Sequence, residues 1–148
     1  MGGSILGNRV LRKEDPKFLT TGGQYVDDLL DEPLLKDAVH VTYARSSVAH
    51  GRILSIDTSE AAQMPGIIAV FTGADLALEP VPSAFNPAAT RTLLAMDKVR
   101  YVGEPLAIIV SETREQGEDA SEAIIVDYDV LEALVDVEQA MTSSVHLY

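Results

Sequence analysis

A series of short segments rich in β-branched residues, each bounded by Gly, Pro or polar turn residues, most constrains the fold of this chain. Such segments are typical of strands of roughly four to eight residues. We expect strands at residues 38–45, 51–58, 67–72, 106–111 and 124–131, with additional strand-like residues at Val99 and Tyr101. In the second of these, strict alternation would place Ile53 and Ser55 on one face and Leu54 and Ile56 on the other.

Helix signals are fewer and shorter. Thr113 and Gln116 form a capping-box pattern, which predicts a helix over residues 114–123 even though Gly117 lies inside it. Shorter helices are predicted after other capping residues, at residues 16–20, 59–64 and 137–141. Strands with two or three short helices indicate an α+β fold, and the lack of regular βαβ alternation argues against a doubly wound nucleotide-binding sheet.

Composition excludes several function classes. The formal net charge of -12 argues against binding to nucleic acid or to an anionic membrane surface. The apolar runs are too short to span a bilayer, and the first residues lack a secretory apolar region, so we expect a cytoplasmic protein without membrane insertion. Because the chain has no Cys, it has no thiolate for an iron–sulfur cluster or a zinc site.

The segment RSSVAHGRILSID, residues 45–57, places Ser, His and Asp close together in sequence. A hydrolase using Ser47 and His50 is one interpretation, but the segment lacks the glycines of a nucleophile elbow, and triad residues usually come from separate elements. An anion site at Arg45 and Arg52 is a second interpretation. A third is that these arginines pair with nearby carboxylates such as Asp57 or Glu60, and that the segment is the bend between two strands.

Three longer stretches carry a family resemblance. They read GNRVLRKEDPKFLTTGGQYVDDL, ARSSVAHGRILSIDTSEAAQMPGIIAVFTGADL and KVRYVGEPLAIIVSETREQGEDASEAIIVDYDVLEALVD. Together, in this order, they resemble the start of the molybdenum-binding large subunit of the xanthine dehydrogenase, aldehyde oxidase and carbon monoxide dehydrogenase family. The chain departs from the family pattern at Gly117, where alanine is usual, and in lacking a proline after the last strand.

The resemblance implies a single α/β-hammerhead domain over residues 1–148, with a small mixed sheet. Within it we expect an N-terminal arm at residues 1–30, a long loop or excursion at residues 77–97, and the start of a linker at residues 141–148. The family's enzymes are oxidoreductases that act on a small substrate at a molybdenum held by molybdopterin, and iron–sulfur and FAD groups lie on partner components. The resemblance implies no cofactor in this chain itself.

No catalytic, cofactor-binding or metal-binding residue can be carried over, because the family's catalytic and molybdopterin contacts lie beyond the hammerhead domain. The expected function is therefore a structural domain, inactive alone, of a molybdopterin-dependent hydroxylase or dehydrogenase. The expected partners are the remaining molybdopterin-binding domains and the iron–sulfur and flavin subunits; the alternative is a stand-alone binding or assembly module. Candidate interface or structural residues are Arg45, His50, Arg52, Tyr101, Gly103 and Glu104, and Glu104 is expected to pair with an Arg.

Overall fold

The computed structural model describes residues 12–148 apart from 21, 24, 30 and 31. The chain divides into two compact units, residues 1–38 and residues 39–148. The first eleven residues of the expected N-terminal arm lie outside the described residues. The rest of the smaller unit contains the helix α1 (Asp15–Thr20) and two 3₁₀ turns, η1 (Val26–Leu29) and η2 (Pro33–Leu35).

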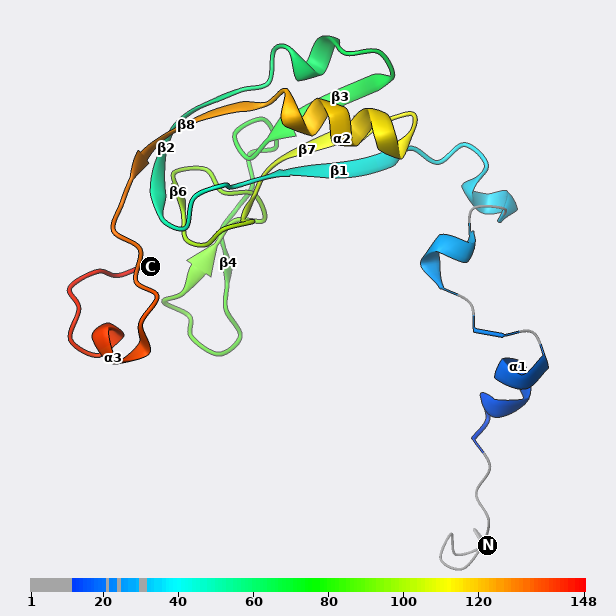
Figure 1. The fold of residues 1–148 in the computed structure, drawn as a ribbon, viewed down its shortest axis with the longest axis horizontal. Coiled ribbons are helices and arrows are strands. Elements are labelled where there is room, and N and C mark those ends of the chain that lie inside the picture. The colour runs from blue at the N-terminus through cyan, green and yellow to red at the C-terminus, as the bar shows by residue number, and fades with distance from the viewer. Residues whose placement is uncertain (1–11, 21, 24, 30–31) are drawn as a thin grey trace, which may run out of the picture. The chain divides into compact units, whose positions relative to one another are not determined.

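The first sheet of the larger unit has the strand order β1-β7-β3 (Figure 1). β7 (Pro105–Ser111) is the central strand, and β1 (His40–Arg45) and β3 (Ile67–Thr72) pair with it from either side. Its sequence LAIIV is apolar throughout, with Ala107 and Ile109 buried on one face and Ile108 and Val110 half-buried on the other. These strands confirm the sequence predictions to within two residues.

The second sheet has the order β6-β2-β8 and is formed by β6 (Lys98–Val99), β2 (Gly51–Asp57) and β8 (Ile125–Val130). Its register shifts between Ile53 and Ser55, so Leu54 is an extra residue relative to β8. Such a bulge changes the phase of the alternation. Ile53 and Ile56 therefore both pack against the core while Leu54 is exposed, and the predicted alternation along β2 is wrong.

All strand pairs among the described residues are antiparallel, including the short pair of β4 (Val81–Pro82) and β5 (Thr90–Arg91). The expectation of a mixed sheet is therefore wrong. The reason lies in the connection after β7, which passes through a helix and delivers the chain to the second sheet. Parallel pairs within one sheet require a crossover that returns the chain to that same sheet.

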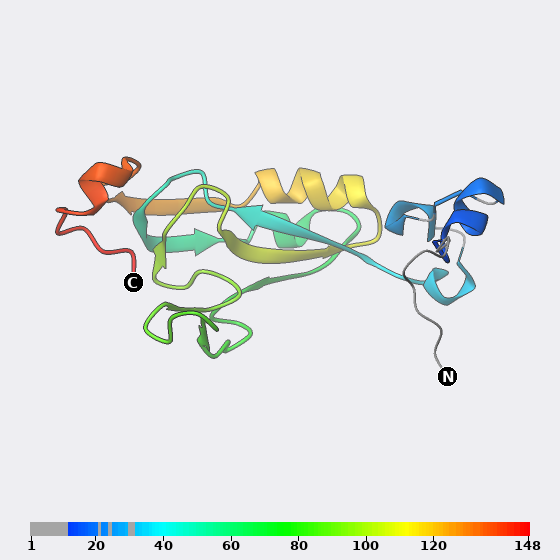
Figure 2. The same cartoon turned by 90° about the horizontal axis from the view of Figure 1, so that it is seen from below.

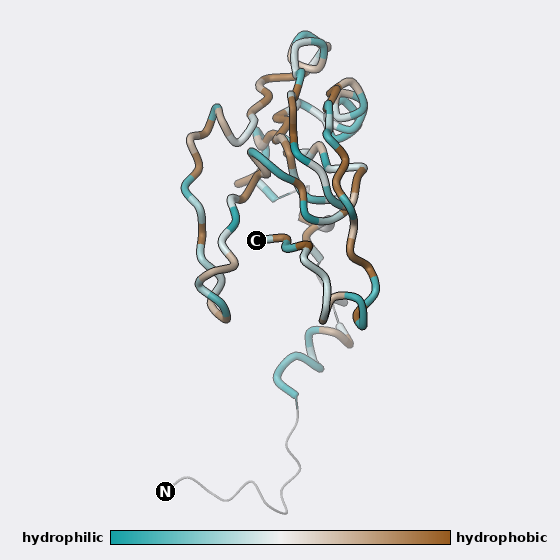
Figure 3. The backbone as a smooth tube through the Cα atoms, turned by 90° about the vertical axis from the view of Figure 1, so that its left-hand side faces the viewer, coloured by the Kyte–Doolittle hydropathy of each residue, from teal (hydrophilic) through white to brown (hydrophobic). Residues whose placement is uncertain are grey.

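Helix α2 (Arg114–Glu122) covers one face of the first sheet (Figures 1 and 2). It begins with the predicted capping box: Gln116 N–H donates to the Thr113 hydroxyl, and the Gln116 side chain accepts from the Thr113 N–H. Most of the helix is hydrophilic (Figure 3), and its buried residues are only Gly117 and Ala120. The helix therefore packs through small side chains, which brings its backbone close to the sheet.

The remaining elements are short. The helix predicted at residues 59–64 is a 3₁₀ turn, η3 (Ala61–Gln63), since Met64 adopts the extended conformation expected before a proline. Asp136 caps α3 (Val137–Ala140) as predicted, by accepting two backbone N–H groups. The segment 77–97 contains β4 and β5, and Leu94 and Ala95 near its end are buried in the core.

Two clusters of buried apolar residues form the core of the larger unit. The first lies between α2 and the first sheet and is built from small residues around Ile109: Ala44, Ala61, Ala107 and Ala120. The second lies against the second sheet and consists of Ala95, Val99 and Leu106, packed by side chains that include Ile53 and Tyr128. β7 supplies residues to both clusters and so joins them.

Candidate functional site

The two motif segments RSSVAH and YVGEP meet at a pair of backbone hydrogen bonds, which we call the motif junction, residues 45–46 and 103–104. Ser46 N–H donates to the Glu104 carbonyl at 2.9 Å, and Gly103 N–H donates to the Ser46 carbonyl at 2.8 Å. The Arg45 guanidinium adds a third bond, to the Gly103 carbonyl at 3.0 Å. Segments almost sixty residues apart in sequence are thus held together through main-chain atoms.

Arg45 is fixed from two sides. Besides its bond to Gly103, its guanidinium lies 5.3 Å from the centre of the Tyr43 ring, within the range of a cation–π contact. The predicted pairing of Arg45 and Arg52 with Asp57 or Glu60 is wrong, because the ion pairs of the described residues involve neither arginine. The physical reason is strand geometry: Asp57 is at the opposite end of β2 from the bend.

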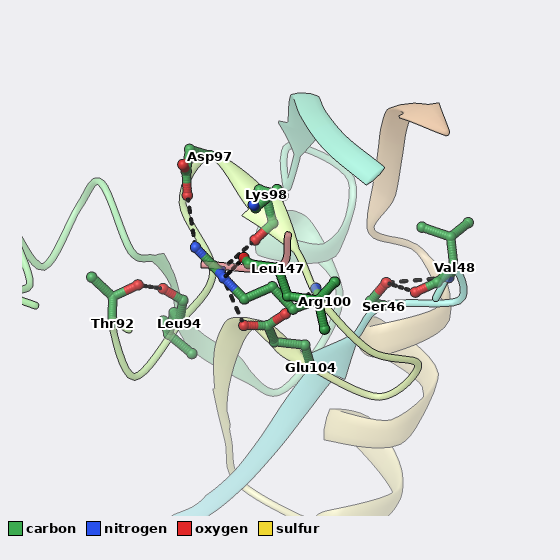
Figure 4. Close-up of polar contacts among 9 residues, drawn as sticks. All are labelled: Ser46, Val48, Thr92, Leu94, Asp97, Lys98, Arg100, Glu104 and Leu147. Carbon is green, nitrogen blue, oxygen red and sulfur yellow. Dashed lines mark hydrogen bonds and ion pairs between the residues drawn. The ribbon is translucent and has the colours of Figure 1, made fainter. Parts of the chain in front are cut away.

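Glu104 pairs with an arginine as expected, and that arginine is Arg100 (Figure 4). The buried Glu104 carboxylate accepts the Arg100 backbone N–H at 2.6 Å and lies 3.5 Å from the Arg100 guanidinium. The guanidinium also donates to the carbonyls of Lys98 at 2.9 Å and Leu147 at 3.2 Å, and Asp97 lies 3.8 Å away. Arg100 therefore links the turn before β7 to the C-terminal segment.

His50 is buried at the end of the bend, with 5% of its surface exposed. Its Nδ1 lies 2.7 Å from the Glu132 carbonyl, and because a carbonyl oxygen only accepts, Nδ1 carries the proton. The His50 carbonyl accepts Leu131 N–H at 2.9 Å. The side chain and the backbone of His50 are therefore both hydrogen-bonded to the segment that follows β8. The His50 Nε2 is buried without a hydrogen-bond partner.

A cavity of about 420 Å³ adjoins this histidine. It is lined by basic, acidic and apolar residues in or next to β2 and β6 and in the C-terminal segment: His50, Arg52, Asp97, Lys98, Leu131, Glu132, Val145 and His146. The exposed Arg52 is opposite Asp129 in the register with β8. The cavity thus brings together two of the predicted candidate residues and two of the three histidines of the sequence.

The same positions exclude the triad interpretation. Asp57 is separated from His50 by the length of β2, and its carboxylate accepts the Ser59 N–H at 2.9 Å. Hydrogen bonds from the side chain and backbone of Ser59 hold the pKa of the Asp57 carboxyl below its ordinary value of 3.8. Ser46, and not Ser47, is the buried serine of the segment; its hydroxyl donates to the Val48 carbonyl at 2.8 Å and accepts the Val48 N–H.

Tyr101 and Gly103 lie in the turn that leads to β7. Gly103 has a φ of 89°, a left-handed conformation that residues with a side chain rarely adopt. Tyr101 is 41% exposed, and its carbonyl accepts the Glu104 N–H at 3.3 Å. The turn therefore depends on Gly103 for its shape, while the Tyr101 side chain is partly exposed.

The chain lacks the ligands of an iron–sulfur cluster. An iron–sulfur cluster needs thiolates, which a chain without Cys lacks. Within the described part of the chain, no group of three or more His, Asp or Glu side chains is placed to bind a metal. No helix among those residues is long and apolar enough to cross a membrane.

Comparison with known proteins accounts for this geometry. Residues 20–132 match the family model for the a/b hammerhead domain of aldehyde oxidase and xanthine dehydrogenase. The chain belongs to this family. The hammerhead match covers both motif segments, and it confirms the resemblance and the fold class predicted from the sequence.

The relatives are much longer than this chain. It is 38% identical to the nicotine 6-hydroxylase large subunit of Paenarthrobacter nicotinovorans over 93% of the chain and 17% of that relative. It is 38% identical to the carbon monoxide dehydrogenase large chain of Afipia carboxidovorans, over 92% of the chain and 16% of the relative. The hammerhead chain thus spans about a sixth of the length of these relatives.

Solved structures give the same result. The crystal structure of the Cu,Mo-CO dehydrogenase superimposes with a TM-score of 0.76 at 38% identity, over 91% of this chain and 17% of that one. Quinoline 2-oxidoreductase from Pseudomonas putida 86 superimposes with a TM-score of 0.73 at 36% identity, over 91% of this chain and 17% of that one. The fold of this chain is therefore shared with the Cu,Mo-CO dehydrogenase and with quinoline 2-oxidoreductase.

Sequence reasoning did not identify Arg100 or Ser46 as site residues. The signal for Arg100 was its place four residues before Glu104, but this spacing predicts a contact only within a helix, and the segment here is a turn. Ser46 lay within the matched motif, yet nothing in the sequence distinguishes it from its neighbour Ser47.

Proposed function

We propose that this chain is the N-terminal structural domain of the large subunit of a molybdopterin-dependent hydroxylase or dehydrogenase, and that it does not catalyse alone. The observation that carries the proposal is the match of residues 20–132 to the hammerhead family model, in a chain that covers 17% and 16% of two large subunits. The motif residues support the same role, since Arg45, His50 and Glu104 all bond to backbone atoms of this domain. Their conformational role is to hold the bend and the turn in place.

The proposal includes the partners. The remaining molybdopterin-binding domains would follow the C-terminal segment, so that residues 141–148 begin the linker to them. The segments 1–30 and 77–97 would contact other parts of the assembly. The molybdenum cofactor would be held by the following domains and the iron–sulfur and FAD groups by partner subunits, in a cytoplasmic complex. One relative is named as subunit gamma of a dehydrogenase complex, which supports a multi-subunit assembly.

Co-purification tests the proposal. An affinity-tagged copy of the 148-residue chain, recovered from its source cell, is expected to bring with it the remaining part of the large subunit, identified by mass spectrometry, together with molybdenum measured by elemental analysis. The purified chain alone is expected to hold no molybdopterin. Tight binding of molybdopterin by the isolated chain, or turnover of a substrate by it, would contradict the proposal.

The alternative of a stand-alone binding or assembly module predicts a different result in the same experiment. The tagged chain would then be recovered without molybdenum and without any large-subunit polypeptide. Cell fractionation separately tests the cytoplasmic location.

A further inference from the structure

On one face of the first sheet, Leu106 is buried in the second core cluster at one end, and the rest of the face belongs to neither core cluster. The register aligns two rows of side chains across the three strands on this face. The first row is Tyr43, Ile108 and Phe71, and the second is Val41, Val110 and Ala69. We call these six residues the open face.

The opposite face of the same sheet shows what a covered face of this domain looks like. There Ala44, Ala107 and Ile109 are buried, in a cluster completed by α2 and η3. On the open face, by contrast, Val41 is 52% exposed, Tyr43 42% and Phe71 36%, and none of the six residues is part of either core cluster. An apolar sheet face left without a covering layer typically marks a contact surface.

The charge pattern points to an apolar counterpart. The chain carries 23 Asp and Glu residues, yet the open face has no carboxylate in either row. The nearest charged group defined by a contact is the Arg45 guanidinium, which lies over the Tyr43 ring at one end. An apolar surface without carboxylates fits an apolar counterpart better than a charged one.

The size of the relatives identifies the occupant. Because the chain spans 17% of a large subunit, a hammerhead domain in that setting is accompanied by about five times its own length of further polypeptide. We propose that the open face packs against an apolar surface of the molybdopterin-binding part of the large subunit. This inference rests on the proposed function and adds to it the face through which the domain is attached.

Lysine substitutions test the inference in the full 148-residue chain. V41K on β1 and F71K on β3 each place a charge on an edge strand of the open face, where burial would leave it unpaired. We expect each to reduce recovery of the molybdenum-containing large-subunit polypeptide by roughly tenfold or more, because an unpaired buried charge costs well over the ~1.4 kcal/mol that a tenfold change represents. The midpoint of thermal unfolding is expected to stay near that of the unsubstituted chain, since both side chains are already exposed.

I125K is the matched control, because Ile125 is an apolar strand residue with 63% exposure on the second sheet. It is expected to leave recovery of the large-subunit polypeptide unchanged.

Full recovery with both V41K and F71K would overturn the inference while leaving the proposed function intact. The use of two sites protects the test against one variant failing to fold. Recovery of no such polypeptide by the unsubstituted chain would overturn both. A homodimer that V41K and F71K dissociate, with recovery unchanged, would assign the face to a second copy and also overturn the inference.

Discussion

The polar side chains buried in the described residues are Ser46, His50, Glu104 and Ser111, and each forms a hydrogen bond to the backbone. A buried polar group is costly unless it is paired, so these bonds must form together with the fold. At the residue scale, the buried polar residues of the motif segments therefore stabilise the conformation of the backbone around them. Ser46 and His50 hold the bend after β1, and Glu104 holds the turn before β7.

We predict that Glu104→Gln lowers the free energy of unfolding by roughly 1–3 kcal/mol, because a charge-assisted hydrogen bond is weakened and the partly buried Arg100 loses its counter-charge. Urea denaturation measures the change. The control is Glu118→Gln, which removes an ion pair whose side chains are 59% and 71% exposed. Exposed pairs contribute little, so this control is expected to change stability by less than about 0.5 kcal/mol. Equal effects of the two substitutions would contradict the assigned role of Glu104.

We predict that His50→Ala and Arg52→Ala differ sharply although the residues are two apart. His50→Ala removes the bond to the Glu132 carbonyl and leaves a cavity, so we expect a loss of roughly 2–4 kcal/mol. Arg52 is exposed and forms no ion pair among the described residues, so its replacement should change stability by less than about 0.5 kcal/mol. Thermal unfolding and recovery of the large-subunit polypeptide, measured separately, check both. A stable His50→Ala variant with impaired recovery would assign His50 to the interface.

At the scale of elements, the central relation is the close approach of α2 to the first sheet. Propensity alone would favour alanine at position 117, because glycine costs about 1 kcal/mol inside a helix. A Cβ at this position would lie 2.5 Å from the Thr42 hydroxyl and 2.8 Å from the Ser111 hydroxyl. The glycine is thus required by packing against β1 and β7.

We predict that Gly117→Ala destabilises the domain by roughly 1–3 kcal/mol, because the steric cost of overpacking exceeds the gain in helix propensity. The exposed helical residue Asp119 supplies the control: Asp119→Ala should be neutral or slightly stabilising. Combining Gly117→Ala with Thr42→Ala removes the nearest obstructing atom, the Thr42 hydroxyl oxygen, and should recover part of the loss in a double-mutant cycle. Unfolding by urea reports all four variants, and a stabilised Gly117→Ala would show that α2 can move away from the sheet.

At the scale of the whole molecule, both core clusters consist of residues of the 39–148 unit. In the smaller unit no residue of α1 or η2 is buried, and Phe18, Leu19 and Leu34 are among its exposed apolar side chains. Residues 39–148 therefore contain both clusters of the hydrophobic core, and a domain of this size can bury enough surface to fold alone.

We therefore predict that a chain beginning at Val39 folds cooperatively, with a single thermal transition and a midpoint within a few degrees of the 148-residue chain. Circular dichroism and amide NMR spectra check this outcome. Loss of the cooperative transition on removing residues 1–38 would show that the smaller unit contributes to the stability of the larger one.

The sequence by itself determined the local structure. Several elements follow from sequence patterns that depend only on interactions between neighbouring residues. These elements are the strands at 40–45, 67–72 and 125–130, the capping box at Thr113 and the cap at Asp136. Its resemblance to a known family also determined the fold class. These signals persist because β-branching, capping and turn preferences act within a few bonds of the residue that carries them.

Only the tertiary structure decided which distant residues meet. Four features depend on how two sheets and a helix pack. They are the bulge at Leu54, the pairing of Glu104 with Arg100, the bond from His50 to Glu132 and the close approach of Gly117 to Thr42. Such contacts are set by the simultaneous burial of many side chains, and no local pattern records that packing. The same holds for the open face, whose residues alternate along three strands and form a continuous surface only when β1, β7 and β3 lie side by side.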